Sequence, residues 1–177
     1  MDGERVIYSG RPQGEVTETE KQIYDFLDGH NISFSRLDRI KSDGETEDVY
    51  TILGIRRLKN LLLCNAQRSA FYLLVMPADV PFKSAVLSSQ MGTSRFKFAP
   101  EEYLDRYLHA HHGTSSIMGL VFDKENKVKL LIDSRVLEEK YIGCLPCTEN
   151  ASLRFEKDDI LNKFLPAVLH DYTVVTM

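Results

Sequence analysis

The chain has 177 residues, a length that suits one globular domain, and its apolar and charged fractions are ordinary. Its net charge of −4 argues against a protein that binds nucleic acid such as DNA over a wide basic face, because phosphate neutralisation supplies most non-specific affinity. No stretch approaches the roughly 20 apolar residues of a membrane span, and no signal peptide begins the sequence, so we expect a cytoplasmic protein. Three cysteines, too few for a disulfide scaffold, fit a reducing compartment.

The N-terminal part divides into a leader and the start of a domain. Residues 1–14 hold two polar turns bounded by glycine, so we expect a flexible leader followed by a single domain over 15–177. A helix is predicted from Thr17, because Thr17 and Glu20 have the spacing of a capping box. Gly29 is expected to end this helix in a left-handed conformation.

Two apolar hairpins are the strongest signals in the middle of the chain. The first is predicted over 58–76, where Lys59 and Asn60 open an apolar run that turns at 65–67 and returns. The second is predicted over 119–133, where two apolar strands flank a polar four-residue turn. Each hairpin would lie largely within the core.

Shorter elements surround these hairpins. Strands are predicted over 32–34, 96–99, 141–145, 151–155 and 172–175. Helices are predicted over 45–53, 82–90, 100–108, 134–139 and 158–169. Because helices are interleaved with hairpins rather than alternating strictly with strands, the pattern predicts an α/β fold of the α+β type. It consists of a single domain with a mixed, mostly antiparallel sheet surrounded by helices.

Positive charge is concentrated at two places in this acidic chain. Arg56, Arg57 and Lys59 cluster before the first hairpin, and Arg95 and Lys97 flank a later strand. These side chains are compatible with a small positive mouth for the 3′ end of an RNA. A solvated charged rim is the alternative that composition alone favours.

Cysteines and histidines give only weak signals. Cys144 and Cys147 have the spacing of a redox motif, but a turn follows them rather than the helix that would lower a thiol pKa. Only Cys64 remains to complete a zinc site of four ligands, and the histidines within 109–112 suit a helix C-terminus without any metal. We therefore expect neither a metal nor a cofactor.

A small-residue loop over 113–117 is a further candidate site. The Gly-x-Ser-x-Gly pattern of a nucleophile elbow fails, because the fifth residue is Ile117. Gly113 would allow a tight turn, so that successive main-chain N–H groups bind one carbonyl oxygen or oxyanion. An ordinary helix-to-strand connection is the alternative.

Lys59 is the charged side chain that the pattern places beside a buried strand. A lysine at the entrance to an apolar strand can sit at the edge of a cavity, where its ammonium pairs with phosphate, hydroxyl or carbonyl groups. A surface lysine whose aliphatic stem lies on the apolar strand is the alternative.

Four anchors occur in an order typical of one known family. They are Lys59-Asn60-Leu61, the loop from Gly113 to Ile117, Ile132-Asp133, and Leu145-Pro146 with Asn150. With these anchors, residues 17–175 resemble the YbaK and prolyl-tRNA-synthetase-associated editing-domain family, in particular its free-standing, PrdX-like prolyl-tRNA editing branch.

The resemblance implies a trans-editing deacylase that hydrolyses the ester of a mischarged tRNA, with alanyl-tRNA for proline as the expected substrate and prolyl-tRNA synthetase as a further partner. It implies catalytic roles for Lys59 and Gly113, without a metal or cofactor. The substrate-binding residues that it implies are Asn60, Thr114, Ser115, Ser116, Ile117, Leu145 and Asn150.

The sequence departs from the family pattern at two anchors. Ile117 stands where the family has a loop proline, and Leu145 stands where it has a histidine. These departures leave open a non-catalytic paralogue of the same fold that binds tRNA or a synthetase. A thiol redox protein, based on Cys144 and Cys147, is a third hypothesis.

Overall fold

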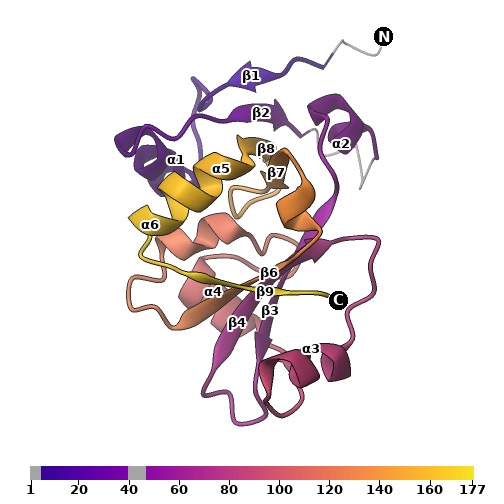
Figure 1. Cartoon of the computed structure of the whole chain (residues 1–177). Coiled ribbons are helices and arrows are strands. Elements are labelled where there is room, and N and C mark those ends of the chain that lie inside the picture. The colour runs from indigo at the N-terminus through magenta and orange to yellow at the C-terminus, as the bar shows by residue number, and fades with distance from the viewer. Residues whose placement is uncertain (1–4, 40–46) are drawn as a thin grey trace.

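The computed structural model describes residues 5–39 and 47–177, which form an α+β arrangement with two sheets (Figure 1). One sheet is antiparallel throughout and has the order β1 (Tyr8–Ser9), β2 (Ser35–Asp38), β8 (Ala151–Glu156), β7 (Tyr141–Cys144). The other is mixed and has the order β5 (Lys97–Phe98), β3 (Leu58–Cys64), β4 (Phe71–Pro77), β6 (Val128–Asp133), β9 (Tyr172–Val175). The predicted fold class is confirmed, with the strands divided between two sheets.

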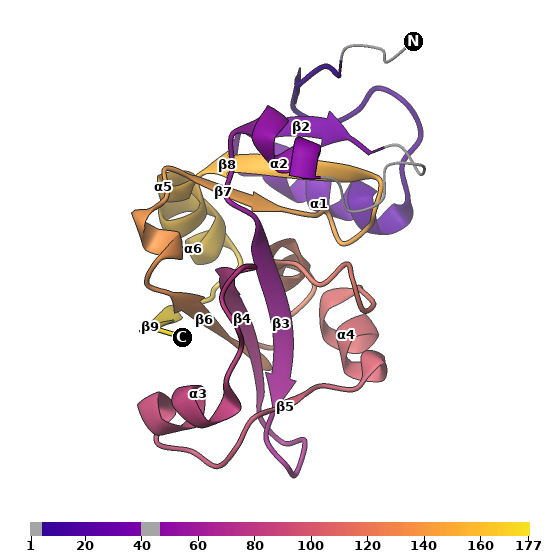
Figure 2. The same ribbon diagram turned by 90° about the vertical axis from the view of Figure 1, so that its right-hand side faces the viewer.

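The helices cover both sheets. Their bounds are α1 (Glu18–Gly29), α2 (Glu47–Leu53), α3 (Ser84–Met91), α4 (Glu101–Leu108), α5 (Lys157–Asp159) and α6 (Leu165–Ala167). Two 3₁₀ helices, η1 (Ile117–Val121) and η2 (Val136–Glu138), and one π-helical turn, η3 (Ile160–Phe164), complete the set. Figure 2 shows α3 and α4 on opposite sides of the mixed sheet. Within the described ranges, no helix is long and apolar enough to cross a membrane.

The first helix begins and ends close to its predicted bounds, but the left-handed conformation predicted for Gly29 is wrong. The left-handed residue is Asn31, with φ of +54°, two positions after the helix ends. The Thr17 hydroxyl accepts a hydrogen bond from the Glu20 N–H at 3.2 Å, which confirms the predicted cap. Ile23 and Leu27, one helical turn apart, are fully buried against the core.

The first hairpin is also confirmed. Its strands β3 and β4 pair in register from Leu58 opposite Pro77 to Cys64 opposite Phe71. Because side chains alternate along a strand, Leu62 and Cys64 face the main core, whereas Leu63 faces the smaller core under α3. By the same alternation, Lys59 and Asn60 lie on opposite faces of β3.

The second predicted hairpin, over 119–133, is wrong. Its first half is the 3₁₀ helix η1, and β6 pairs in parallel with both β4 and β9. Hydrogen bonds from side chains cause the difference: the Ser116 hydroxyl caps η1 by accepting from the Met118 N–H at 3.1 Å. The Asp123 carboxylate accepts from the N–H groups of Lys127 and Val128, which directs the chain into β6.

Smaller differences concern other short elements. The strand predicted over 32–34 begins later, at Ser35–Asp38. Ile32 and Phe34 are buried in the core, and the residues that pair with β1 and β8 follow them. The helix predicted over 134–139 is reduced to η2, and the one predicted over 158–169 is divided into α5, η3 and α6. Of the helix predicted over 45–53, residues 45 and 46 lie outside the described residues.

The described part of the predicted leader, residues 5–14, contacts the domain. Its strand β1 pairs with β2, and the Gly10 N–H donates to the Phe34 carbonyl at 3.0 Å. The Arg11 guanidinium lies 2.6 Å from the Asp25 carboxylate on α1. Residues 1–4 lie outside the described residues.

Gly119 provides a test of the packing between η1 and α4. A Cβ atom at this position would lie 2.7 Å from Leu108 Cβ and 2.8 Å from the Leu108 carbonyl oxygen. Because main-chain atoms would have to move, we expect Gly119→Ala to lower the free energy of unfolding by about 1–3 kcal/mol in urea titrations. Gly29→Ala is the control, since a Cβ atom there has no neighbour within 4 Å. Equal stability of the two variants would contradict this packing argument.

Candidate functional site

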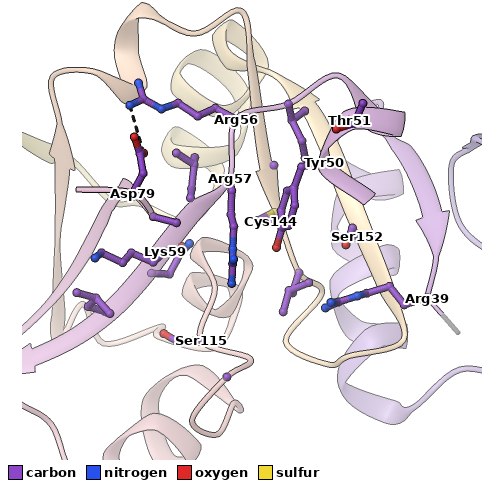
Figure 3. A pocket seen from close by; sticks show the side chains of 18 residues that line it. Arg39, Tyr50, Thr51, Arg56, Arg57, Lys59, Asp79, Ser115, Cys144 and Ser152 are labelled. Atoms are coloured by element: carbon purple, nitrogen blue, oxygen red, sulfur yellow. Dashed lines mark hydrogen bonds and ion pairs between the residues drawn. The ribbon is translucent and has the colours of Figure 1, made fainter. Parts of the chain in front are cut away.

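A cavity of about 800 Å³ lies where the two sheets meet (Figure 3). Its walls come from the start of β3, from α2, from the loop over 113–115 and from β7. Five residues predicted for the site line this cavity: Lys59, Asn60, Gly113, Ser115 and Leu145. The fold therefore brings together side chains that are separated by more than fifty residues in the sequence.

Lys59 lies on one wall of the cavity and is half-buried. Its ammonium donates a hydrogen bond to the Val80 carbonyl at 2.6 Å, in the segment that follows β4. An ammonium has three N–H donors, so this bond fixes the direction of the side chain and leaves two donors.

Asn60 occupies the opposite face of β3 and also lines the cavity. Its side-chain oxygen Oδ1 accepts a hydrogen bond from the main-chain N–H of Ile117 at 2.9 Å. This bond joins β3 directly to the start of η1, which follows the small-residue loop.

The small-residue loop is held on both sides of Ser115. Gly113 has φ of +95°, a conformation that requires glycine, and this residue turns the chain into the cavity wall. Thr114 is fully buried, and its hydroxyl is hydrogen-bonded to the main chain of His111. Ser116 is also fully buried, and its hydroxyl donates to the Leu145 carbonyl at 2.5 Å. Thr114 and Ser116 thus hold the loop rather than line the cavity.

Ser115 contributes polar groups that the rest of the described chain does not satisfy. Its hydroxyl oxygen is buried and has no hydrogen-bond partner among the described residues, although the residue lines the cavity. Within the same ranges, the main-chain N–H groups of Ser115 and Ser116 have no acceptor either. Because Ser115 lines the cavity and Ser116 does not, the unpaired donors of Ser115 are the ones available to a ligand carbonyl.

Besides Thr114 and Ser116, two further predicted site residues lie away from the cavity lining. Ile117 is only 1% exposed, and its side chain packs in the main core. Its contact with the site is the hydrogen bond from its main-chain N–H to the Asn60 side chain. The Asn150 side chain donates to the Glu20 carboxylate at 2.6 Å, outside the lining. The Asn150 carbonyl accepts from the main-chain N–H of Arg39 at 2.9 Å, and Arg39 does line the cavity.

Positive side chains outnumber acidic ones around the cavity. Arg39, Arg56, Arg57 and Lys59 line it, and Asp79 is the one acidic residue among the described lining residues. Arg56 is bound to Asp79 and Glu139, each at 3.4 Å. The predicted positive mouth is therefore present in an acidic chain, but Arg95 and Lys97 do not belong to it. Lys97 pairs with Cys64, at the opposite end of β3.

The sequence did not identify two cavity residues, Arg39 and Tyr50. In Figure 3, three side chains point into the same space: Arg57, which precedes β3, Tyr50 on α2, and Arg39, which follows β2. The guanidinium carbon of Arg57 lies 5.6 Å from the centre of the Tyr50 ring, within the range of a cation–π interaction. The position of Tyr50 on α2, one residue after the buried Val49, was the available signal that its ring faces outward from the core.

The cysteines do not support thiol chemistry. All three are free and buried, and burial raises the pKa of Cys144 to about 12 despite a hydrogen bond with Ser116. Burial likewise raises the pKa of Cys147 far above its ordinary value. A reactive cysteine requires the opposite shift, because the thiolate is the nucleophile.

Thiol reactivity tests this conclusion. We expect iodoacetamide at pH 8 to alkylate Cys144 and Cys147 much more slowly in the folded protein than in urea, because burial disfavours the thiolate. Peptide mass spectrometry over a time course measures each rate. Rapid alkylation of either cysteine in the folded protein would restore the redox hypothesis.

The histidine cluster is explained by local contacts. The His109 ring stacks on Phe122 with centroids 3.9 Å apart, and the His111 ring is hydrogen-bonded to the His112 carbonyl. Across residues 5–39 and 47–177, no group of three or more histidine, cysteine or acidic side chains is arranged to hold a metal ion.

Known proteins resemble this chain in sequence and in fold. Residues 45–163, more than half of the chain, match the sequence model of the family described as the aminoacyl-tRNA editing domain. The prolyl-tRNA editing protein ProX of Acetoanaerobium sticklandii is 24% identical over 146 residues, which cover 76% of this chain and 89% of the relative.

Two solved structures share the fold. A candidate trans-editing enzyme for prolyl tRNA synthetase superposes with a TM-score of 0.69 at 11% identity, covering 92% of this chain and 99% of the other. A hypothetical protein superposes with a TM-score of 0.65 at 15% identity, covering 85% and 96%.

Proposed function

The chain belongs to the aminoacyl-tRNA editing domain family, and from this membership we propose that it is a trans-editing deacylase of mischarged tRNA. The observation that carries the proposal is the cavity itself. It combines Lys59, Asn60 and the loop of Gly113 and Ser115 in one space, so that a cation, an amide and main-chain donors can contact one ester substrate. The name of the relative ProX and that of one structural neighbour, both concerned with prolyl-tRNA editing, support the same reaction.

The charges around the cavity support an RNA substrate. Four cations line a site in a chain whose net charge is −4, so attraction for phosphate is concentrated at the cavity. An aminoacylated tRNA would place its aminoacyl ester in the cavity and its terminal phosphates beside Arg39 and Arg57. Prolyl-tRNA synthetase, which releases the mischarged tRNA, is the proposed further partner.

The proposed reaction is hydrolysis of the aminoacyl ester. Water adds to the carbonyl carbon, the bond from that carbon to the ribose oxygen breaks, and the ribose oxygen takes up a proton. Amino acid and uncharged tRNA are the products. Lys59 is proposed to position the substrate, while the unpaired main-chain N–H of Ser115 stabilises the charge that develops on the carbonyl oxygen.

Alanyl-tRNA for proline is the proposed substrate. Editing is needed where a synthetase discriminates weakly, because a missing methylene changes binding by only about 1–3 kcal/mol. The Leu145 side chain gives the cavity an apolar wall, which suits the methyl group of alanine.

A deacylation assay on a panel of aminoacyl-tRNAs tests the proposal. Alanyl-tRNA for proline should be hydrolysed faster than seryl-tRNA or cognate prolyl-tRNA. The alternative is a non-catalytic tRNA-binding module, favoured by leucine rather than histidine at position 145. Tight binding of tRNA without hydrolysis of any panel member would establish that alternative.

A further inference from the structure

The contact between Asn60 and Ile117 determines how a side-chain amide faces the cavity. Asn60 lies at the cavity end of β3, and its Oδ1 accepts the Ile117 N–H at 2.9 Å across 57 residues of sequence. Ile117 is held in turn, because its side chain is buried in the core and the preceding Ser116 is bound to the Leu145 carbonyl. The donor side of this contact is therefore rigid.

The chemistry of the contact fixes which end of the amide is free. A main-chain N–H can pair only with the oxygen of an asparagine side chain, so Oδ1 is committed to Ile117 and Nδ2 points elsewhere. Within the described ranges, Nδ2 has no acceptor, and Asn60 is half-buried in the cavity wall. Two N–H donors are thus present at the wall without a protein partner.

We infer that Asn60 Nδ2 donates a hydrogen bond to the oxygen of the scissile carbonyl, and that the Ile117 N–H is the positioning group that orients it. The inference rests on the proposed deacylase function and adds a specific oxyanion donor to it. A neutral amide held in place before the substrate arrives stabilises the developing negative charge without reorganisation, and one such donor changes kcat by about 10²- to 10³-fold.

This contact explains what isoleucine contributes at position 117, where the family has proline. A proline at this position has no main-chain N–H and could not donate to Asn60 Oδ1. In this chain, isoleucine supplies that N–H, so Ile117→Pro would leave the Asn60 amide free to rotate. The effect would be on orientation, since the Ile117 side chain does not line the cavity.

Asn60→Asp tests the donor with the least change in shape. Aspartate keeps an oxygen for the Ile117 N–H and replaces Nδ2 by a second oxygen, which cannot donate when ionised. We expect its single-turnover rate on alanyl-tRNA for proline, at saturating enzyme, to fall by at least about 100-fold. Asn65→Asp is the matched control, because it makes the same charge change at the hairpin turn, outside the cavity lining.

The positioning role has its own measurements. Ile117→Pro should be slowed by at least about tenfold, Ile117→Val should be faster than Ile117→Pro, and the proline should add no further loss in an Asn60→Asp background. Amide hydrogen exchange of Ile117 gives a readout that is independent of activity. Its N–H should exchange slowly in wild type and in Asn60→Asp, and faster in Asn60→Ala.

The outcomes separate this inference from the proposed function. Hydrolysis by wild type and by Asn65→Asp, with a large loss in Asn60→Asp, would support it. An Asn60→Asp rate within threefold of wild type would overturn the donor while leaving the deacylase in place. Unchanged Ile117 exchange in Asn60→Ala would overturn the positioning role. Absence of hydrolysis by wild type on every aminoacyl-tRNA would instead remove the proposed function, and this inference with it.

Discussion

Lys59→Ala should reduce the single-turnover rate on alanyl-tRNA for proline by at least about 100-fold. The Lys59 ammonium is directed by its 2.6 Å bond to the Val80 carbonyl and lies in the cavity wall. Loss of a positioned cation misplaces the ester relative to its oxyanion donors, and small misplacements of reacting atoms cost orders of magnitude in rate. Rapid-quench measurement at saturating enzyme separates this loss from weaker binding.

Two further variants define the origin of the effect at Lys59. Lys59→Arg keeps the charge but not the compact ammonium, so only partial recovery is expected. Lys124→Ala removes the same charge from an exposed turn and should retain the wild-type rate. Circular dichroism should show an unchanged fold for Lys59→Ala, because Lys59 is half-buried at a strand end and leaves no core cavity. A fully active Lys59→Ala protein would remove Lys59 from the site.

Asp123→Ala should lower the free energy of unfolding by about 3–5 kcal/mol, measured in urea. The Asp123 carboxylate is 1% exposed and receives His170 Nε2 at 2.9 Å, together with the N–H groups of Lys127 and Val128. Its removal leaves a buried imidazole and two main-chain donors without their acceptor. Asp171→Ala, an exposed neighbour of His170, is the control and should change stability little.

The same carboxylate predicts a dependence of stability on pH. Burial alone would raise the pKa of Asp123, but hydrogen bonds from His170, Val128 and Lys127 outweigh it, so the pKa is lowered. A lowered folded-state pKa contributes stability above the unfolded value of about 3.9, and this contribution is lost as the pH falls through the folded value. Wild type should therefore lose more stability between pH 5 and pH 2 than Asp123→Ala. Equal losses would contradict this assignment.

Local patterns predicted those parts of the fold that local contacts determine. The cap at Thr17 and the first hairpin depend on residues close in sequence, and both were predicted. The course of residues 119–133 depends instead on Asp123, whose carboxylate binds His170, 47 residues away. The consecutive apolar residues at 120–122 cannot reveal such a contact, and a strand was predicted where the chain forms η1.

The residues of the candidate site also divide into those that local motifs identify and those whose positions depend on residues distant in sequence. Lys59, Asn60 and Gly113 could be identified from the sequence because they lie in recognisable motifs, and the structure places them around one cavity. The position of Asn150 outside the cavity lining could not be predicted, because it depends on Glu20, 130 residues away on α1. Arg39 lies in no motif, so only the tertiary structure reveals that it reaches the cavity.

Single-turnover hydrolysis by the wild-type protein tests directly whether it is a deacylase of alanyl-tRNA for proline. Alanyl-tRNA for proline and prolyl-tRNA, each labelled in the amino acid, should be compared at equal enzyme concentration. We predict that the alanyl ester is released at least about tenfold faster than in buffer alone, while the prolyl ester decays at the rate in buffer. Decay of the alanyl ester at the buffer rate, with tRNA bound, would contradict the proposed deacylase function.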